Sequence, residues 1–335
     1  MKAPTHRPQF MLALLAGMAA LLLAAAPGLS YLPDFTAPGP QPDHWAFAAF
    51  PVTWNLNPST GSNLSGSRSV ADVMQSSFNT WTGAPNAALS VTRGADSAVS
   101  SEGASPSNIN LICFVCTDAD FAKDSTTLAV TITTTANAAG ESNGHNGTTT
   151  FVGQLLKADI VFNPASKFTT DGSCPSGATC QDLQTVATHE VGHFFGLDHS
   201  GVVRAVMFPA ASSLVTLSYD DIAGLSVLYH KSSPDVATGS ISGTVTMSGG
   251  AGIFGAHVFA ESVSGNTAFG SNVRKSQVGT LTRPDGTFNI QGLPADSYIV
   301  VAEPLDGPVM NSDVSGYPAA FGQPSLQTNF TTRWH

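Results

Sequence analysis

The chain has 335 residues, which is long enough for two domains. It carries 13 Lys and Arg against 23 Asp and Glu, so its formal net charge is −10, and only 11% of its residues are charged. This balance, without runs of Lys or Arg, argues against nucleic acid as a partner, and an acidic surface serves solubility.

The N-terminus has the layout of a secretory signal peptide. Lys2 and Arg7 precede an uncharged run over residues 10–26, and small residues follow. The run is short for a transmembrane helix, which needs about 20 residues, although an uncleaved N-terminal anchor is the alternative. Residues 1–30 are therefore predicted to be a signal peptide, and residues 31–42, rich in Pro, an extended leader. A secreted, extracellular protein with no membrane span after signal removal is expected.

A sheet and a long helix are predicted for the next part of the chain. Strand-like patterns occur at residues 50–56, 88–92, 109–114, 128–133 and 158–163. Apolar residues at helical spacing predict one helix with a core-facing stripe, formed by Val70, Val73, Met74, Ser77, Phe78 and Trp81. Ser69 is placed to cap the N-terminus of this helix.

Four cysteines in an exported chain indicate two disulfides. Cys113 lies close to Cys116, and Cys174 close to Cys180, so local pairing is the simplest of three connectivities. The rival interpretation of Cys113 and Cys116 is half of a zinc knuckle, or a redox pair. A knuckle needs a second close pair, and Cys174 and Cys180 are spaced too widely for the usual ligand turn. The pairs Cys113–Cys116 and Cys174–Cys180 are therefore predicted to be disulfides.

The stretch HEVGHFFGLDH, which begins at His189, carries the chemistry. On a helix, His189 and His193 lie one turn apart on one face and can hold one zinc ion. Glu190 is rotated away from both, where it can act as general base on a zinc-bound water without being a ligand. Gly196 can take the left-handed conformation that ends a helix, so that His199 reaches the metal from the other side. Three nitrogen ligands leave a fourth position open, as catalytic zinc sites do.

A bare H-E-x-x-H can arise by chance from two core histidines and a solvated Glu. Gly196 and His199 extend it to H-E-x-x-H-x-x-G-x-x-H, which resembles the metzincin signature. Ser200, directly after it, resembles the matrixin branch, the group of the matrix metalloproteinases. Two later stretches agree in order and spacing: residues 205–209 resemble the Met-containing turn below the metal, and residues 217–225 the helix that follows.

The resemblance to the matrixin catalytic domain is strongest over residues 182–229. It implies an α+β fold, with a twisted mixed sheet and long helices. It also implies that Met207 forms an apolar floor beneath the imidazoles, and that Pro209 helps to line the pocket for the residue after the cut. The strand at residues 158–163 would form the edge along which substrate lies. Asp182, by residue type and place, is expected to cap the active-site helix.

Two departures from the vertebrate matrixins are visible. Those enzymes hold a second, structural zinc with three histidines and an aspartate, whereas only His44 and His145 lie between the signal peptide and His189. One zinc, the catalytic one, is therefore expected. No cysteine precedes Cys113 in this sequence, so latency through a propeptide cysteine is not expected. Both departures fit a bacterial-type secreted matrixin.

Matrixins also bind Ca²⁺. Four loop aspartates could serve as ligands here, although no ligand pattern singles them out: Asp118, Asp120, Asp124 and Asp171.

The last helix of this domain has a capping-box-like start at Ser218 and Asp221. In vertebrate matrixins an acidic residue of this helix can pair with the new N-terminal ammonium after activation, and Asp220 or Asp221 could do so here. Helix capping and favourable pairing with the helix dipole explain the same residues and are favoured.

Residues 232–238 have the composition of a linker between the catalytic domain, residues 43–231, and a second domain. Short strands with Gly turns follow over residues 239–305 and resemble the carboxypeptidase regulatory-like module, a small all-β sandwich of transthyretin-like topology. The segments that carry this resemblance are Gly243-Thr-Val, Gly255-Ala-His-Val, Asp285-Gly-Thr-Phe, Gly292-Leu-Pro and Tyr298. Residues 306–335 form a tail without assignment. Because all the metzincin elements precede the linker, residues 43–231 are expected to fold and cleave peptides alone.

The sequence thus predicts a secreted zinc-dependent endopeptidase acting on protein or peptide substrates. Glu190 would take the proton of the zinc-bound water and later give it to the leaving amine. One alternative is another metzincin family, serralysin- or astacin-like, against which Ser200 and residues 208–209 argue. The other is a cell-surface or extracellular binding protein with a vestigial metzincin domain, against which the intact Glu190 and the three histidines argue.

Overall fold

The computed structural model describes residues 31–36, 39–100, 109–121, 126–140, 148–210, 213–265, 267–270 and 277–335. The predicted signal peptide, Asp124 and His145 lie outside these ranges. Within them, no helix combines the length and the apolar character needed to cross a membrane.

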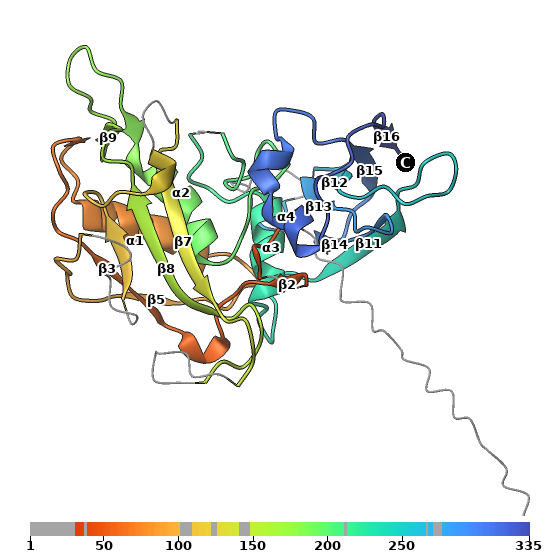
Figure 1. The fold of residues 1–335 in the computed structure, drawn as a ribbon, viewed down its shortest axis with the longest axis horizontal. Helices are drawn as coiled ribbons and strands as arrows, with labels where there is room; N and C mark the ends of the chain where they lie inside the picture. Colours follow the sequence, from red (N-terminus) through yellow and green to blue (C-terminus); the bar gives the residue numbers. More distant parts are fainter. Residues whose placement is uncertain are drawn as a thin grey trace, which may run out of the picture.

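The first part of the chain, up to the linker, is a mixture of strands and helices (Figure 1). Its strands are β1 (Phe35–Thr36), β2 (Gln41–Pro42), β3 (Val52–Leu56), β4 (Leu64–Ser65), β5 (Val91–Arg93), β6 (Asn110–Cys113), β7 (Ala129–Thr135), β8 (Leu155–Phe162), β9 (Phe168–Thr169) and β10 (Gln181–Asp182). Its α-helices are α1 (Val70–Thr82), α2 (Leu183–Phe194) and α3 (Tyr219–Leu228), with 3₁₀ helices at Phe47–Ala49 and Ala119–Phe121.

A five-stranded sheet in the order β5-β3-β6-β8-β7 forms the frame of this part. β5, β3, β6 and β8 run parallel, and β7 pairs antiparallel with β8 at the edge. The prediction that residues 158–163 form the substrate edge is therefore wrong: they belong to β8, an inner strand, and β7 is the edge. The burial explains the difference, since β8 ends in the continuous buried run Ala158–Phe162, as an inner strand should, whereas β7 is mostly half-buried.

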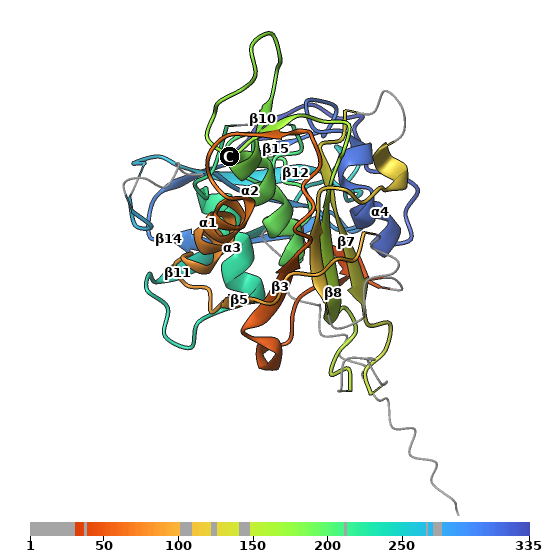
Figure 2. The same ribbon diagram turned by 90° about the vertical axis from the view of Figure 1, so that its left-hand side faces the viewer.

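Helices α1 and α2 lie on one face of this sheet (Figure 2). The predicted stripe of α1 is buried, apart from the half-buried Val70, and the Ser69 side chain accepts a hydrogen bond from the Asp72 N–H at 3.1 Å. Asp182 caps α2 by accepting from the Thr185 N–H at 2.9 Å. The Trp81 indole N–H donates to the Thr188 carbonyl at 2.7 Å and so fixes α1 against α2. Both cap predictions are confirmed.

The cysteines form the two local disulfides, Cys113–Cys116 and Cys174–Cys180. The first lies at the end of β6, and the second closes a loop just before α2. Both lie in the part of the chain before the linker.

The C-terminal part consists of two small sheets and a short helical tail. One sheet pairs β11 (Thr238–Thr244) with β14 (Thr287–Pro294), and the other has the order β13-β12-β15-β16, with β13 at Gln277–Leu281, β12 at His257–Ser262, β15 at Tyr298–Glu303 and β16 at Arg333–Trp334. The sequence pattern did not reveal β13. The tail holds a 3₁₀ helix (Asn311–Val314) and helix α4 (Gly316–Ala320). The transthyretin-like topology stays a prediction.

The two parts pack closely, with α3 between them (Figure 1). Asp220 on α3 accepts a hydrogen bond from the Gly279 N–H of β13 at 2.8 Å, and the Tyr219 ring lies edge-on to Phe269 at a centroid distance of 4.9 Å. One apolar cluster runs through both parts, from Trp54 on β3 to Ile290 on β14.

Candidate metal centre

Helix α2 and the turn that follows it bring the three predicted ligands together. His189 and His193 lie one turn apart, with their Nε2 atoms 3.2 Å from each other. Gly196 has a φ of +85°, and a Cβ there would lie 2.0 Å from the Asp43 carbonyl oxygen, so only Gly fits this turn. The chain then returns, and the His199 ring comes to 5.3 Å from that of His189, centroid to centroid. One ligand atom from each imidazole lies within 4.8 Å of the other two.

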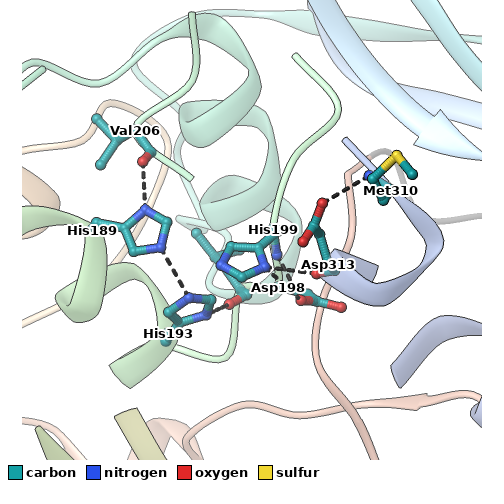
Figure 3. Close-up of polar contacts among 8 residues, drawn as sticks. His189, His193, Asp198, His199, Val206, Met310 and Asp313 are labelled. Atoms are coloured by element: carbon teal, nitrogen blue, oxygen red, sulfur yellow. Dashed lines mark hydrogen bonds and ion pairs between the residues drawn. The ribbon is translucent and has the colours of Figure 1, made fainter. Parts of the chain in front are cut away.

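Each imidazole is oriented by a backbone carbonyl at its Nδ1 (Figure 3). Val206 supplies the carbonyl for His189 at 2.8 Å, Leu197 supplies that for His193 at 2.7 Å, and Asp313 supplies that for His199 at 2.6 Å. A carbonyl oxygen can only accept, so each Nδ1 carries the proton and donates it. The lone pair of every Nε2 is then free for a metal, which is how protein partners orient ligating histidines.

Burial keeps the rings of His189 and His193 neutral. Together with the neighbouring imidazoles, it lowers the pKa of His189 to about 4 and that of His193 well below its ordinary value. At neutral pH these two residues therefore present uncharged nitrogen ligands. Three imidazoles with convergent nitrogens suit Zn²⁺, and their number leaves a position for water or substrate.

Glu190 lies beside the imidazoles and is 5% exposed. The Thr131 hydroxyl on β7 donates to its Oε2 at 2.7 Å and also lies 3.0 Å from its backbone carbonyl. Burial raises the pKa of Glu190 to about 7, whereas the Thr131 hydrogen bond lowers it. A carboxylate with a pKa near the working pH suits a general acid–base group.

The turn that contains Met207 lies beneath α2. A Cβ at Gly192 would lie 2.1 Å from the Met207 sulfur, so that sulfur packs directly on the helix backbone between His189 and His193. The Asp221 carboxylate accepts from the Val206 N–H at 2.9 Å and the Met207 N–H at 3.2 Å. Asp221 thereby holds Val206, whose carbonyl orients His189.

The two acids of α3 thus have interior partners. Asp221 forms the predicted capping box with Ser218, in addition to holding the turn. Asp220 accepts from the Ser200 hydroxyl at 2.5 Å and from the Gly279 N–H, and burial raises its pKa to about 6. Helix capping, the favoured interpretation, is confirmed for Asp221, and Asp220 links the metal-binding turn to the C-terminal part.

Other candidate residues of the sequence lie elsewhere. The His44 ring stacks on Phe151 at 4.3 Å, and its Nδ1 lies 3.0 Å from the Pro42 carbonyl. The Asp171 carboxylate accepts from the Ser67 N–H at 2.7 Å and organises its own loop. Ca²⁺ binding stays a prediction. Pro209 is half-buried at the end of the Met207 turn, and its role in a substrate pocket also stays a prediction.

Sequence reasoning did not foresee three contributors to this site. Thr131 is one of several Thr in a strand, with nothing in the pattern to single it out. Asp221 was recognised for its capping box, which gives no hint of its contact with the Met207 turn. Asp313 lies in a tail without a motif, and only the folded chain brings its carbonyl to His199.

Comparison with known proteins agrees with this geometry. Residues 124–230 match the family model described as Matrixin. Over shorter stretches the chain is similar to plant and mammalian metalloproteinases. It is 52% identical over 54 residues to Metalloendoproteinase 5-MMP of Arabidopsis thaliana, covering 15% of each chain. It is 47% identical over 51 residues to Metalloendoproteinase 1 of Glycine max, covering 14% of this chain and 17% of that protein. Matrilysin of Rattus norvegicus is 50% identical over 50 residues, covering 14% of this chain and 19% of that protein.

These similarities are local. The matched stretch spans 15% of the length of Metalloendoproteinase 5-MMP. They support a matrixin-type zinc metalloendopeptidase domain around the three histidines. The bacterial type and the identity of the C-terminal module stay predictions.

Proposed function

We propose that this protein is a secreted, zinc-dependent endopeptidase. The observation that carries the proposal is the convergence of three imidazoles, each with its Nδ1 hydrogen-bonded to a backbone carbonyl, next to the buried Glu190. The match to the matrixin family over residues 124–230 supports the same chemistry.

His189, His193 and His199 would hold the zinc. When bound, zinc would act as a Lewis acid that lowers the pKa of its bound water and polarises the scissile carbonyl. Glu190 removes the proton from the attacking water and carries it to the leaving amine, as general acid–base groups do. Thr131 holds the Glu190 carboxylate at Oε2, so that Oε1 is left to accept that proton.

The edge position of β7 supports a peptide substrate. An edge strand offers unpaired N–H and C=O groups, to which an extended peptide can add as a further strand. Thr131 lies in the middle of β7, and its hydroxyl contacts Glu190, so a peptide along this edge passes the general base.

Secretion is proposed from the N-terminal sequence and the disulfides. Residues 1–30 have the signal-peptide layout, and both disulfides require an oxidising compartment to persist.

The Glu190→Ala variant tests the mechanism. Zinc content and cleavage of a peptide library are measured for the wild type and for the variant. We expect one zinc per chain in both proteins, because Glu190 is not a ligand, and a loss of cleavage by about 10²–10⁴-fold or more in the variant. His199→Ala, which removes a ligand, should lose zinc and activity together. Equal cleavage by wild type and Glu190→Ala would refute the role of Glu190. A wild type that holds zinc but cleaves no peptide would favour the binding-protein alternative.

A further inference from the structure

A segment near the C-terminus lies against the metal centre, although more than 100 residues separate it from the histidines (Figure 3). Val314 of this segment is 0% exposed, in an apolar cluster that also holds Val309 and Tyr317 of the segment and Phe208 of the Met207 turn. The Tyr317 hydroxyl donates to the Leu281 carbonyl at 3.0 Å, and the Asn311 side chain accepts from the Leu326 N–H at 2.9 Å. These contacts fix the 3₁₀ helix Asn311–Val314 in place.

The Asp313 carbonyl points from this helix to His199 and accepts from its Nδ1 at 2.6 Å. The carbonyls that orient the other two imidazoles come from the catalytic part itself, at Val206 and Leu197. His199 follows α2 in a stretch without helix or strand, and it is the ligand whose orienting carbonyl comes from beyond the linker.

A competing acceptor for His199 lies too far away. The Asp198 carboxylate is 4.0 Å from His199 Nδ1, beyond hydrogen-bond distance, and its Oδ1 accepts from the His199 backbone N–H at 2.7 Å. The Asp313 carboxylate also has its own partner, because it accepts from the Met310 N–H at 2.7 Å. The backbone carbonyl of Asp313 is thus the group that faces the ring nitrogen.

We propose that the C-terminal segment 309–317 completes the zinc centre, with the Asp313 carbonyl as the positioning group that fixes the tautomer and direction of His199. The proposal rests on the zinc endopeptidase function above. It makes the C-terminal part a component of the catalytic unit, and it revises the expectation that residues 43–231 act alone. Groups that orient ligating histidines contribute about 10–100-fold to metal affinity, and that is the effect expected here.

Two substitutions at position 314 of the full-length chain separate positioning from packing. A proline disfavours the helical conformation of the residue before it, so Val314→Pro turns the Asp313 carbonyl away from His199. Val314→Ala loses buried side-chain volume at the same position but leaves the Asp313 backbone free to keep its conformation. Zinc dissociation constants are measured by competition with a chelator, and long-range ¹H–¹⁵N spectra of the imidazoles report the protonated nitrogen of each ring.

We expect zinc affinity about 10–100-fold lower in Val314→Pro, together with loss of the slowly exchanging Nδ1–H signal of His199. Val314→Ala should bind zinc within about threefold of wild type and keep that signal, since its carbonyl is not displaced. Equal zinc affinities in the two variants, with an unchanged His199 signal, would overturn the proposal.

If Val314→Pro fails to fold, the imidazole spectrum of the wild type alone tests the proposal. The proposal requires a slowly exchanging Nδ1–H on His199, and a His199 protonated at Nε2, or with a rapidly exchanging Nδ1–H, would overturn it. The function above fails separately, because a wild type that binds no zinc refutes the metal site itself.

Discussion

The carboxylate of Glu190 is positioned by a hydrogen bond from one hydroxyl on the edge strand β7. Thr131 donates to Oε2 at 2.7 Å, and this contact crosses from β7 to α2. A carboxylate without that partner would be free to rotate away from the attacking water. The hydrogen bond also stabilises the ionised form of Glu190 and lowers its pKa, against the effect of burial.

Thr131→Val keeps the size of the side chain and removes the hydroxyl. Hydrogen bonds to charged groups contribute about 1.5–3 kcal/mol, so kcat/KM should fall by roughly 10–100-fold. The pKa of Glu190 should rise, and because the base acts in its ionised form, the acidic limb of the pH–rate profile should move to higher pH. Thr133→Val, two residues along the same face of β7, is the control and should leave the profile in place. A Thr131→Val enzyme with the wild-type profile would show that the hydroxyl neither orients nor ionises Glu190.

Gly192 is constrained by contact, not by its backbone angles. The Met207 sulfur occupies the place of a Cβ at this position, and Trp81 lies 2.8 Å from the same point. Gly192→Ala should therefore push the Met207 turn away from α2 and lower the free energy of unfolding by about 1–3 kcal/mol, as overpacked cores do. Urea unfolding measures this, and Gly192→Ala should cost less stability when it is introduced into Met207→Ala than into the wild type. An equal cost in both backgrounds would mean that the sulfur is not the obstacle.

At the scale of elements, local patterns were enough for α1, α2 and α3 and for the signature around His189, but not for the helices of the tail. The stripe of α1 and the caps at Ser69 and Asp182 follow from spacing and residue type, because helix ends are made by neighbouring residues. The order of strands was not accessible in the same way. Residues 158–163 were expected at the substrate edge, yet β8 lies inside the sheet, because strand order depends on long-range pairing that no short window contains.

The residues of the site also divide into those that local sequence reveals and those that only the folded chain brings together. The three histidines and Glu190 lie within 11 residues, so sequence spacing describes their geometry. Thr131 and Asp313 reach them from 59 and 114 residues away, and each does so with a group that many other residues possess. A hydroxyl in a Thr-rich strand and a backbone carbonyl carry no signal of their own before the chain has folded.

The disulfides are an element-scale prediction that can be checked directly. Peptide mass mapping of the secreted protein without reductant should find Cys113 linked to Cys116 and Cys174 linked to Cys180, as in the structure. Both bonds are local, so neither needs the C-terminal part to form. Free thiols, or links between the two pairs, would contradict this connectivity.

The whole molecule should unfold as one unit, although its sequence divides at a linker. The apolar cluster that holds Trp54 and Trp81 continues into Val258 and Ile290 of the C-terminal sheets. The buried hydrogen bond between Asp220 and Gly279 joins the two parts at the same boundary. A protein with one continuous core has no surface along which one part can unfold and leave the other intact.

Ile290→Ala tests this coupling from the far side of the linker. Ile290 is 0% exposed, and truncation of a buried Ile to Ala costs about 2–5 kcal/mol. Trp45, Trp54 and Trp81 are all buried in the part before the linker, whereas Trp334 on β16 is already 76% exposed in the folded chain. The change in tryptophan fluorescence on unfolding therefore reports mainly the first part, and calorimetry reports the whole chain. We expect one calorimetric transition in the wild type, and an Ile290→Ala variant in which the fluorescence and calorimetric midpoints fall together.

Ile299→Ala supplies the control for that measurement. Ile299 lies on β15 of the same C-terminal part but is 46% exposed, so the same change removes little buried surface there. Its midpoints should stay close to those of the wild type. Two separate transitions, or a tryptophan transition that Ile290→Ala leaves unmoved, would show that the catalytic part is stable by itself. In that case the contact between Asp313 and His199 would join two independently folding domains, and only the orientation of His199 would depend on the C-terminal part.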